Sequence, residues 1–238
     1  MILLAQPFRA ALSDFAAFLR QPRLLASGGL TAPGNARTWL YLTLLSIAVL
    51  LGLILPFIHL WQSLFDLPDP QAFDRVSKAW LVPIVVIIAP LLEELLFRGW
   101  QSGTRAALWL LGCALAVLGA FAMATFPGRE LAALGLIIAA VVAGLIGWLR
   151  LRRNRTPLAW FSRAFPFIFY AMAALFALVH LANYDQITLA VVPLVLPQFW
   201  AALVLGYLRQ RIGLLGSIAA HAASNLCTVG LALLVSSI

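Results

Sequence analysis

Seven long apolar stretches run through this sequence of 238 residues and leave few folds open to it. A helix that crosses the hydrocarbon core of a bilayer needs about 20 mostly apolar residues. The stretches that meet this requirement are Trp39–Leu60, Ala79–Phe97, Arg105–Phe126, Leu131–Leu149, Ala164–Leu181, Ile187–Leu208 and Gly213–Val235. The predicted fold is therefore an all-α, polytopic transmembrane helical bundle of about seven spanning helices.

The low proportion of charged residues supports a membrane location. Only 10% of the residues are charged and 63% are hydrophobic, whereas soluble domains carry about 25% charged residues. The net charge of +8 is carried mainly in short segments between the apolar stretches, where it suits anionic lipid headgroups better than nucleic acid. We expect a multi-pass protein of a bacterial inner or plasma membrane, with membrane lipids and no nucleic acid among its partners.

The distribution of basic residues predicts the orientation. With a cytoplasmic N-terminus, 13 basic residues fall on the cytoplasmic side, and the opposite side holds only Arg75, Lys78 and Arg129, beside acidic residues such as Asp74. Basic residues concentrate in the cytoplasmic loops of membrane proteins. The split favours seven spans with the N-terminus inside and the C-terminus outside.

Two parts of the chain are expected to differ in character. Residues 1–38 are predicted to be a cytoplasmic segment, and residues 39–238 a transmembrane helical domain. Phe8, Leu12, Phe15 and Leu19 recur at helical spacing in the first part, which indicates an amphipathic helix on the membrane surface; a disordered tail is the alternative. In the sixth stretch, Pro193 and Pro197 favour a loop or half-helix at its start.

Ionisable side chains in the second stretch are costly to insert, at about 2.5–3.5 kcal/mol each. Glu94 and Arg98 are four residues apart, so they share a helix face and can form a pair. Glu93 points about 100° away from Glu94 on a helix, which leaves it free to face a cavity. A plain charge cluster at the helix end is the alternative.

Two further pairs of residues, each with a histidine, lie on the fifth and last stretches. Phe176 precedes His180 by four residues, so its ring can pack beside the imidazole. His221 and Asn225 share the same spacing and can aim an imidazole and an amide at one point. Structural hydrogen bonds would explain each pair alone, but together with Glu93 they supply the groups that activate a water and hold an oxyanion.

The sequence resembles a known family in these positions. Glu93-Glu94-x-x-x-Arg98, Phe176-x-x-x-His180 and His221-x-x-x-Asn225 are similar, in order, to the three motifs of the CAAX-protease and bacteriocin-processing (CPBP) membrane proteins. Each motif alone is a weak signal, but three in order on separate stretches are a strong one. The resemblance covers about residues 83–98 and 166–226.

One departure from the family concerns the spacing of the motifs. The first two motifs usually lie on neighbouring helices, whereas Arg105–Phe126 and Leu131–Leu149 intervene here. An even number of extra spans preserves sidedness. Glu93 also lies near the cytoplasmic end of its stretch and His180 nearer the other end, so a kinked or shortened helix is needed to bring them together.

The resemblance implies an intramembrane endopeptidase that hydrolyses a membrane-proximal peptide bond without an acyl-enzyme. Glu93 would activate water with the help of His180, His221 and Asn225 would stabilise the oxyanion, and Glu94, Arg98 and Phe176 would support them. The substrates implied are lipidated or other membrane-associated peptides and proteins. We favour a mechanism without a cofactor, because Asn225 beside His221 suits an oxyanion donor; the alternative is zinc bound by Glu93, His180 and His221.

Two other classes of function compete with a protease. A catalytically inactive family member could act as a membrane scaffold or immunity factor, but each motif residue is retained. A small proton-coupled transporter also uses carboxylates and histidines within the membrane. The sequence shows no inverted repeat and no acidic residue on the remaining stretches, which argues against a transporter.

Overall fold

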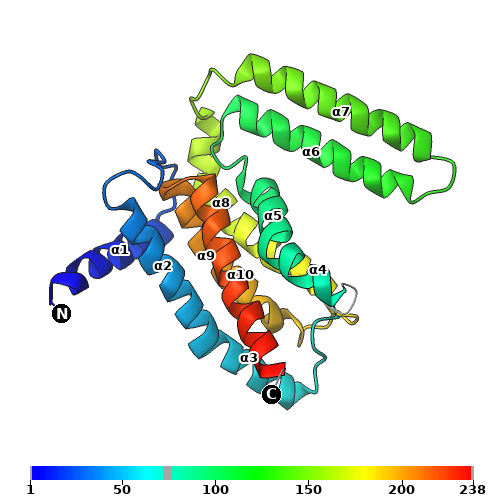
Figure 1. Cartoon of the computed structure of the whole chain (residues 1–238). Coiled ribbons are helices and arrows are strands. Elements are labelled where there is room, and N and C mark those ends of the chain that lie inside the picture. Colours follow the sequence, from blue (N-terminus) through cyan, green and yellow to red (C-terminus); the bar gives the residue numbers. More distant parts are fainter. Residues whose placement is uncertain (1, 72–76, 237–238) are drawn as a thin grey trace. The chain divides into compact units, whose positions relative to one another are not determined.

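The computed structural model describes residues 2–71 and 77–236, which fold into helices joined by loops (Figure 1). Within these residues the only β pairing is an isolated bridge between Thr104 and Pro157. Seven helical segments are long and apolar enough to cross a membrane, namely Asn35–Phe65, Ala79–Arg98, Arg105–Ala124, Glu130–Leu151, Ala159–Asn183, Val192–Arg211 and Leu214–Leu231. The predicted all-α fold with seven spans is confirmed.

The orientation of the spans stays a prediction. Asp74 and Arg75, both used in the charge count, lie outside the described residues, as does the side chain of Lys78. Arg129 lies in the loop before the fourth span, as the sequence predicts.

The chain divides into two compact units. Met1–Glu94 and Phe165–Ile238 make up the first unit, and Leu95–Ala164 the second. The second unit contains α6 (Arg105–Ala124) and α7 (Glu130–Leu151), which Figure 1 shows as an antiparallel hairpin. It therefore holds the two spans that separate the first two motifs.

Close packing holds the α6–α7 hairpin together. Trp109 of α6 donates a hydrogen bond from Nε1 to the carbonyl oxygen of Ala143 on α7, at 2.9 Å. Gly147, one turn farther along α7, leaves room for this indole, because a Cβ at that position would lie 2.0 Å from Trp109 Nε1. Only 11% of the apolar window of α6 and 17% of that of α7 are buried, so most of the apolar surface of these helices is open to lipid.

The first unit is built around the last helix. Its complete elements are α1 (Ile2–Arg20), α2 (Asn35–Val49), η1 (Leu50–Ile54), α3 (Leu55–Phe65), α4 (Lys78–Pro83), η3 (Ile84–Ile88), η4 (His180–Asn183), η5 (Val192–Val195), α9 (Leu196–Arg211) and α10 (Leu214–Ser236). It also holds α5 (Ala89–Arg98) up to Glu94 and α8 (Ala159–Val179) from Phe165 onwards. Helix α10 packs against α9, α2 and η3. The seventh span thereby contacts the first, second and sixth spans.

The N-terminal segment forms the predicted helix, and part of its predicted membrane face contacts protein instead. Phe15 and Phe18 of α1 are buried and pack on Tyr207, with ring centroids 5.4 and 5.1 Å apart. Leu12 is 39% exposed instead. Of the residues predicted to face the membrane, Phe15 is thus covered by protein and Leu12 is open, and the position of α1 on a membrane surface stays a prediction.

The sixth span is broken at its start, as its prolines predict. The described chain is irregular before a short 3₁₀ turn, η5, and becomes α-helical only at Leu196. Trp61 of α3 donates from Nε1 to the carbonyl of Ala190 at 2.8 Å, which ties this irregular segment to the first span. Around this bond, an apolar core joins the end of α8 to η1 and α3; its buried members are Leu50, Ile54, Ile58, Ala177, Leu181, Val191, Leu194 and Val195.

Candidate active site

The carboxylate of Glu93 faces the inside of the first unit from the middle of α5. Before α5, the second span makes a π-helical turn, η3, over Ile84–Ile88. Such turns are a recognised cause of helix bending. The side chain of Glu93 is 28% exposed and lines a cavity between the spans, as expected from its angle to Glu94.

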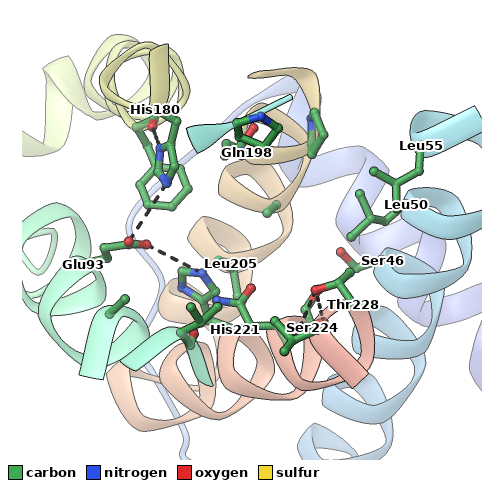
Figure 2. Close-up of a pocket in the computed structure, with 18 of the residues that line it drawn as sticks. Ser46, Leu50, Leu55, Glu93, His180, Gln198, Leu205, His221, Ser224 and Thr228 are labelled. Carbon is green, nitrogen blue, oxygen red and sulfur yellow. Dashed lines mark hydrogen bonds and ion pairs between the residues drawn. The ribbon is translucent and has the colours of Figure 1, made fainter. Parts of the chain in front are cut away.

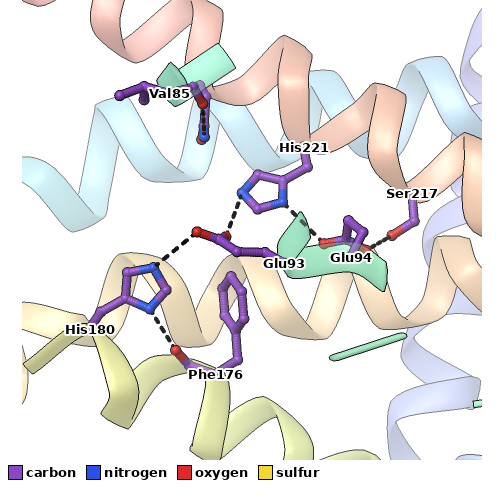
Figure 3. Close-up of polar contacts among 8 residues, drawn as sticks. Val85, Glu93, Glu94, Phe176, His180, Ser217 and His221 are labelled. Carbon is purple, nitrogen blue, oxygen red and sulfur yellow. Dashed lines mark hydrogen bonds and ion pairs between the residues drawn. The ribbon is translucent and has the colours of Figure 1, made fainter. Parts of the chain in front are cut away.

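Both predicted histidines reach this carboxylate (Figure 3). His180 Nε2 lies 4.0 Å from Glu93 Oε1, and His221 Nε2 lies 3.7 Å from Glu93 Oε2. These separations exceed a direct hydrogen bond, so both imidazoles face the carboxylate without bonding to it directly. Side chains from the second, fifth and seventh spans thus converge on one point.

Hydrogen bonds at the other ring nitrogens orient both imidazoles. His180 Nδ1 lies 2.7 Å from the carbonyl oxygen of Phe176. Since a carbonyl only accepts, this nitrogen carries the proton and, in the neutral ring, Nε2 is an acceptor. An acceptor nitrogen and a carboxylate that face each other need a proton donor between them, and a water molecule supplies two.

His221 is oriented by Glu94, a contact that the sequence analysis did not predict. His221 Nδ1 lies 3.0 Å from Glu94 Oε1, and Ser217 Oγ donates to Glu94 Oε2 at 2.5 Å. Glu94 and Ser217 are both fully buried, at 0% exposure. With Glu94 ionised, Nδ1 of His221 donates to it, and Nε2 is presented to Glu93.

Ser217 is a residue that the sequence analysis missed. It precedes His221 by four residues, as His221 precedes Asn225, so the three form one stripe along α10. That regular spacing was a usable signal. Arg98, predicted to pair with Glu94, lies four residues after it on the same helix and is buried, at 2% exposure.

Phe176 packs beside the imidazole of His180, as predicted. The ring centroids of Phe176 and His180 are 4.9 Å apart, and those of Phe176 and His221 are 6.0 Å apart. Phe176 is 1% exposed. One buried ring therefore restricts the rotamers of both histidines.

Asn225 lies farther along the stripe and contacts the π turn. Its Nδ2 donates to the carbonyl oxygen of Val85 at 2.9 Å. The amide group has two N–H donors, so this bond fixes the plane of the amide and leaves a second N–H. Asn225 also lines the same cavity as Glu93, His180 and His221.

The cavity that contains these groups has a volume of about 520 Å³ and lies within the first unit (Figure 2). The first span, in which the sequence shows no motif, provides a large part of its wall. The lining residues from this span are Thr43, Ser46, Leu50, Leu55, Ile58 and Gln62. Pockets that bind small molecules and cofactors have volumes of about 300–1,000 Å³.

Comparison with known families shows whether the chain belongs to the family that its three motifs suggest. The chain matches the family described as type II CAAX prenyl endopeptidase Rce1-like over residues 75–166 and 158–227, which together exceed half of the sequence. The chain belongs to this family. Searches of curated proteins and of solved structures gave no match.

Membership in the Rce1-like family indicates a CAAX-protease-type peptidase. The seven apolar helices make this family member a multi-pass integral membrane protein. The matched region contains all three motifs and also the α6–α7 hairpin between the first two. The first unit holds Glu93, Glu94, His180, Ser217, His221 and Asn225, the polar cluster of the site, whereas Arg98 and the hairpin belong to the second.

Glu93, His180 and His221 of this Rce1-like site are side chains of the types that bind zinc. A tetrahedral zinc ion holds its donor atoms about 3.3–3.6 Å apart, and Glu93 lies 3.7 Å from the one histidine and 4.0 Å from the other. Within the described residues, no group of three or more His, Cys, Asp or Glu side chains is arranged to hold a metal ion. As placed, the separations of these groups are slightly longer than those of zinc ligands.

Proposed function

We propose that this protein is an intramembrane endopeptidase in which Glu93 activates a water for attack on a membrane-proximal peptide bond. The observation that carries the proposal is the convergence of two histidine Nε2 atoms on the Glu93 carboxylate, at 4.0 and 3.7 Å. This convergence lies in a cavity lined by residues of helices long and apolar enough to span a membrane. A water held there has a base on one side and oriented imidazoles on the other.

The chemical step assigns the proton to Glu93. The water oxygen attacks the carbonyl carbon of the scissile peptide bond while its proton passes to Glu93. The carbonyl oxygen takes up the electron pair and becomes an oxyanion. When this intermediate collapses, the C–N bond breaks and the leaving nitrogen takes the proton from Glu93, which gives a carboxylic acid, an amine and the original carboxylate. No acyl-enzyme forms.

Asn225 and His221 are proposed to stabilise the oxyanion, His221 as an imidazolium that carries a proton on Nε2 as well as the one that Nδ1 donates to Glu94. The contact to Val85 fixes the amide of Asn225, and preorganised donors are worth more than mobile ones because they need no rearrangement during the reaction. His180 is proposed to hold the water on the opposite side. Glu94 and Ser217 act as positioning residues, since they contact His221 and each other rather than the reacting atoms.

The substrate class is proposed from the family and from the location of the site. The family name refers to prenylated C-terminal CAAX sequences, and a site within the membrane suits a peptide delivered by a lipid anchor. A lipidated or otherwise membrane-associated peptide or protein is therefore the proposed partner. The alternative function, an inactive membrane scaffold, is tested by the same experiment.

The experiment compares membrane proteomes of cells that express wild-type protein or Glu93→Gln. Peptide termini that are present with the wild type and lost with Glu93→Gln identify cleaved substrates. Glu130→Gln, at the exposed start of α7, is the matched control and should give the wild-type pattern. Identical termini in the wild type and Glu93→Gln would support the scaffold instead.

Zinc bound by Glu93, His180 and His221 is the alternative mechanism, in which the metal would act as a Lewis acid. Elemental analysis of purified, active protein separates the two. We expect activity without stoichiometric zinc and after chelation. One zinc per chain, lost together with activity in His180→Ala, would establish the metal mechanism.

A further inference from the structure

The cavity beside Glu93 extends toward one end of the first unit. On the first span its lining residues reach Gln62, three residues before the span ends at Phe65. On the fifth span they reach Asn183, the last residue of the span, and Tyr184 in the loop after it. We call the end of the unit where these two spans stop the Tyr184 end.

The sixth and seventh spans place the cavity toward the same end. The lining on the sixth span begins at Leu194, near the start of the span, and stops at Leu205, six residues before its end. The seventh span runs in the opposite direction, and its lining begins at Ala220, six residues after its start, and continues to Val229. The hydrogen bond of Trp61 joins the end of the first span to the loop before the sixth. The cavity therefore follows the parts of four spans that meet at the Tyr184 end.

Buried side chains close the opposite end of the unit. Glu94 and Ser217, on the side of the site away from the Tyr184 end, are both fully buried. Tyr207, near the end of α9, is 2% exposed, because Phe15 and Phe18 of α1 pack on its ring. The end of the unit that contacts α1 is thus filled by protein.

The segment between α1 and α2 adds a second cover at this closed end. The N–H group of Gly29 donates to the carbonyl oxygen of Ile212 at 3.0 Å, and Trp39 Nε1 donates to the carbonyl oxygen of Gly216 at 2.8 Å. Both acceptors lie at the turn that joins α9 to α10. At the Tyr184 end, by contrast, the lining residue Tyr184 is partly exposed.

The charges of the chain indicate which side of the membrane each end faces. Arg209 and Arg211 lie at the closed end, where the sixth span stops. Asp66, Asp69 and Asp185 lie in the loops of the Tyr184 end. Basic residues concentrate on the cytoplasmic side of membrane proteins, so the predicted orientation makes the closed end cytoplasmic and the Tyr184 end extracytoplasmic.

We propose that substrates reach Glu93 from the extracytoplasmic face, past Gln62 and Tyr184. The substrate class that fits this route is a lipidated peptide or protein anchored in the extracytoplasmic leaflet, whose membrane-proximal segment enters the cavity at the Tyr184 end. The inference rests on the proposed function, because it gives the origin of the peptide that Glu93 attacks.

The side of access is measured with a cysteine in the cavity wall and a small quaternary-ammonium methanethiosulfonate, whose fixed charge keeps it from crossing a membrane. The parent protein carries alanine in place of Cys113 and Cys227. Ser224→Cys in this parent places a thiol in the cavity lining (Figure 2). We expect this thiol to react in sealed right-side-out vesicles and to stay unmodified in inverted ones.

Two exposed positions provide controls for the orientation of the protein. Asp69→Cys, in a loop of the Tyr184 end, should react only in right-side-out vesicles, and Arg155→Cys, after α7, only in inverted ones. A farnesylated, internally quenched peptide with several charged residues stays in the leaflet to which it is added. Wild-type protein should cleave this peptide in right-side-out vesicles, with loss of cleavage in inverted vesicles.

Any other pattern overturns the proposal: reaction of Ser224→Cys from the cytoplasmic side, from both sides or from neither, or reaction of Arg155→Cys in right-side-out vesicles. Failure of the proposed function has a different signature, because the thiol reaction needs no catalysis. In that case Ser224→Cys would react as expected, while Glu93→Gln would cleave the peptide as the wild type does.

Discussion

Glu93 and Glu94 are neighbours in the chain but have different surroundings, because successive helical residues point in different directions. Glu93 faces the cavity at 28% exposure, whereas Glu94 is fully buried against His221 and Ser217. One carboxylate is therefore accessible to water and substrate. The other can act only through the residues that it holds.

The buried carboxylate predicts a positioning effect on catalysis. Glu94→Gln presents an amide N–H where Ser217 or His221 Nδ1 now donates, so it should turn the imidazole away from Glu93. We expect kcat to fall at least about 10-fold, with KM nearly unchanged. Ser217→Ala should have a smaller effect in the same direction. The hypothesis fails if both variants change KM alone.

Asn225 allows a second prediction about single residues. If its remaining N–H stabilises the oxyanion, Asn225→Ala should lower kcat about 10²–10³-fold with little change in substrate binding. With a zinc ion as Lewis acid, the loss should be much smaller. Steady-state kinetics of the purified variant give the answer, and a loss confined to KM would assign Asn225 to substrate binding instead.

Individual elements were predictable to different degrees. The apolar stretches predict all seven spans, because a single segment in the hydrocarbon core must form its backbone hydrogen bonds internally, as a helix does. Pro193 and Pro197 correctly indicate the break before α9. The π turns at Leu50–Ile54 and Ile84–Ile88 end two residues before Pro56 and Pro90, and a proline within a helix lacks the N–H that the regular bond pattern needs. The meeting of Glu93 with His180 depends on tertiary packing, because straight helices perpendicular to the membrane would not bring them together.

The contribution of the first span to the cavity wall could not be predicted from the sequence. Its cavity-lining residues, such as Thr43 and Leu50, look like ordinary members of an apolar stretch. Their function follows from which helices they contact, and a single sequence carries no direct record of those contacts. The motif residues were identifiable because ionisable groups within a span are costly and therefore conspicuous.

Alanine variants of two glycines at helix contacts test whether the two units contribute separately to activity. A Cβ at Gly206 of α9 would lie 2.7 Å from Phe169 in the first unit, and one at Gly147 would lie 2.0 Å from Trp109 in the second. Both Gly→Ala variants should lose about 1–3 kcal/mol of stability through overpacking. Only Gly206→Ala should lower the activity of the folded protein, because the polar cluster lies in its unit. Equal losses of activity would contradict this separation.

At the scale of the whole molecule, the distribution of basic residues predicts the topology. Reporter fusions after Arg155 should be cytoplasmic, and fusions at Ile238 external, because an odd number of spans places the termini on opposite sides. Paired reporters that are active only in one compartment make the measurement. Two fusions on the same side would rule out seven spans in this arrangement.

The central claim is that Glu93 supplies the base for peptide-bond hydrolysis, and the direct measurement is the turnover of purified protein on an internally quenched farnesylated peptide. The wild type and the Glu130→Gln control should cleave it at similar rates. Glu93→Gln should lower kcat by at least about 10²-fold, with an unchanged melting temperature, since the side chain keeps its size and is partly exposed. Turnover near the wild-type rate in well-folded Glu93→Gln would contradict the claim.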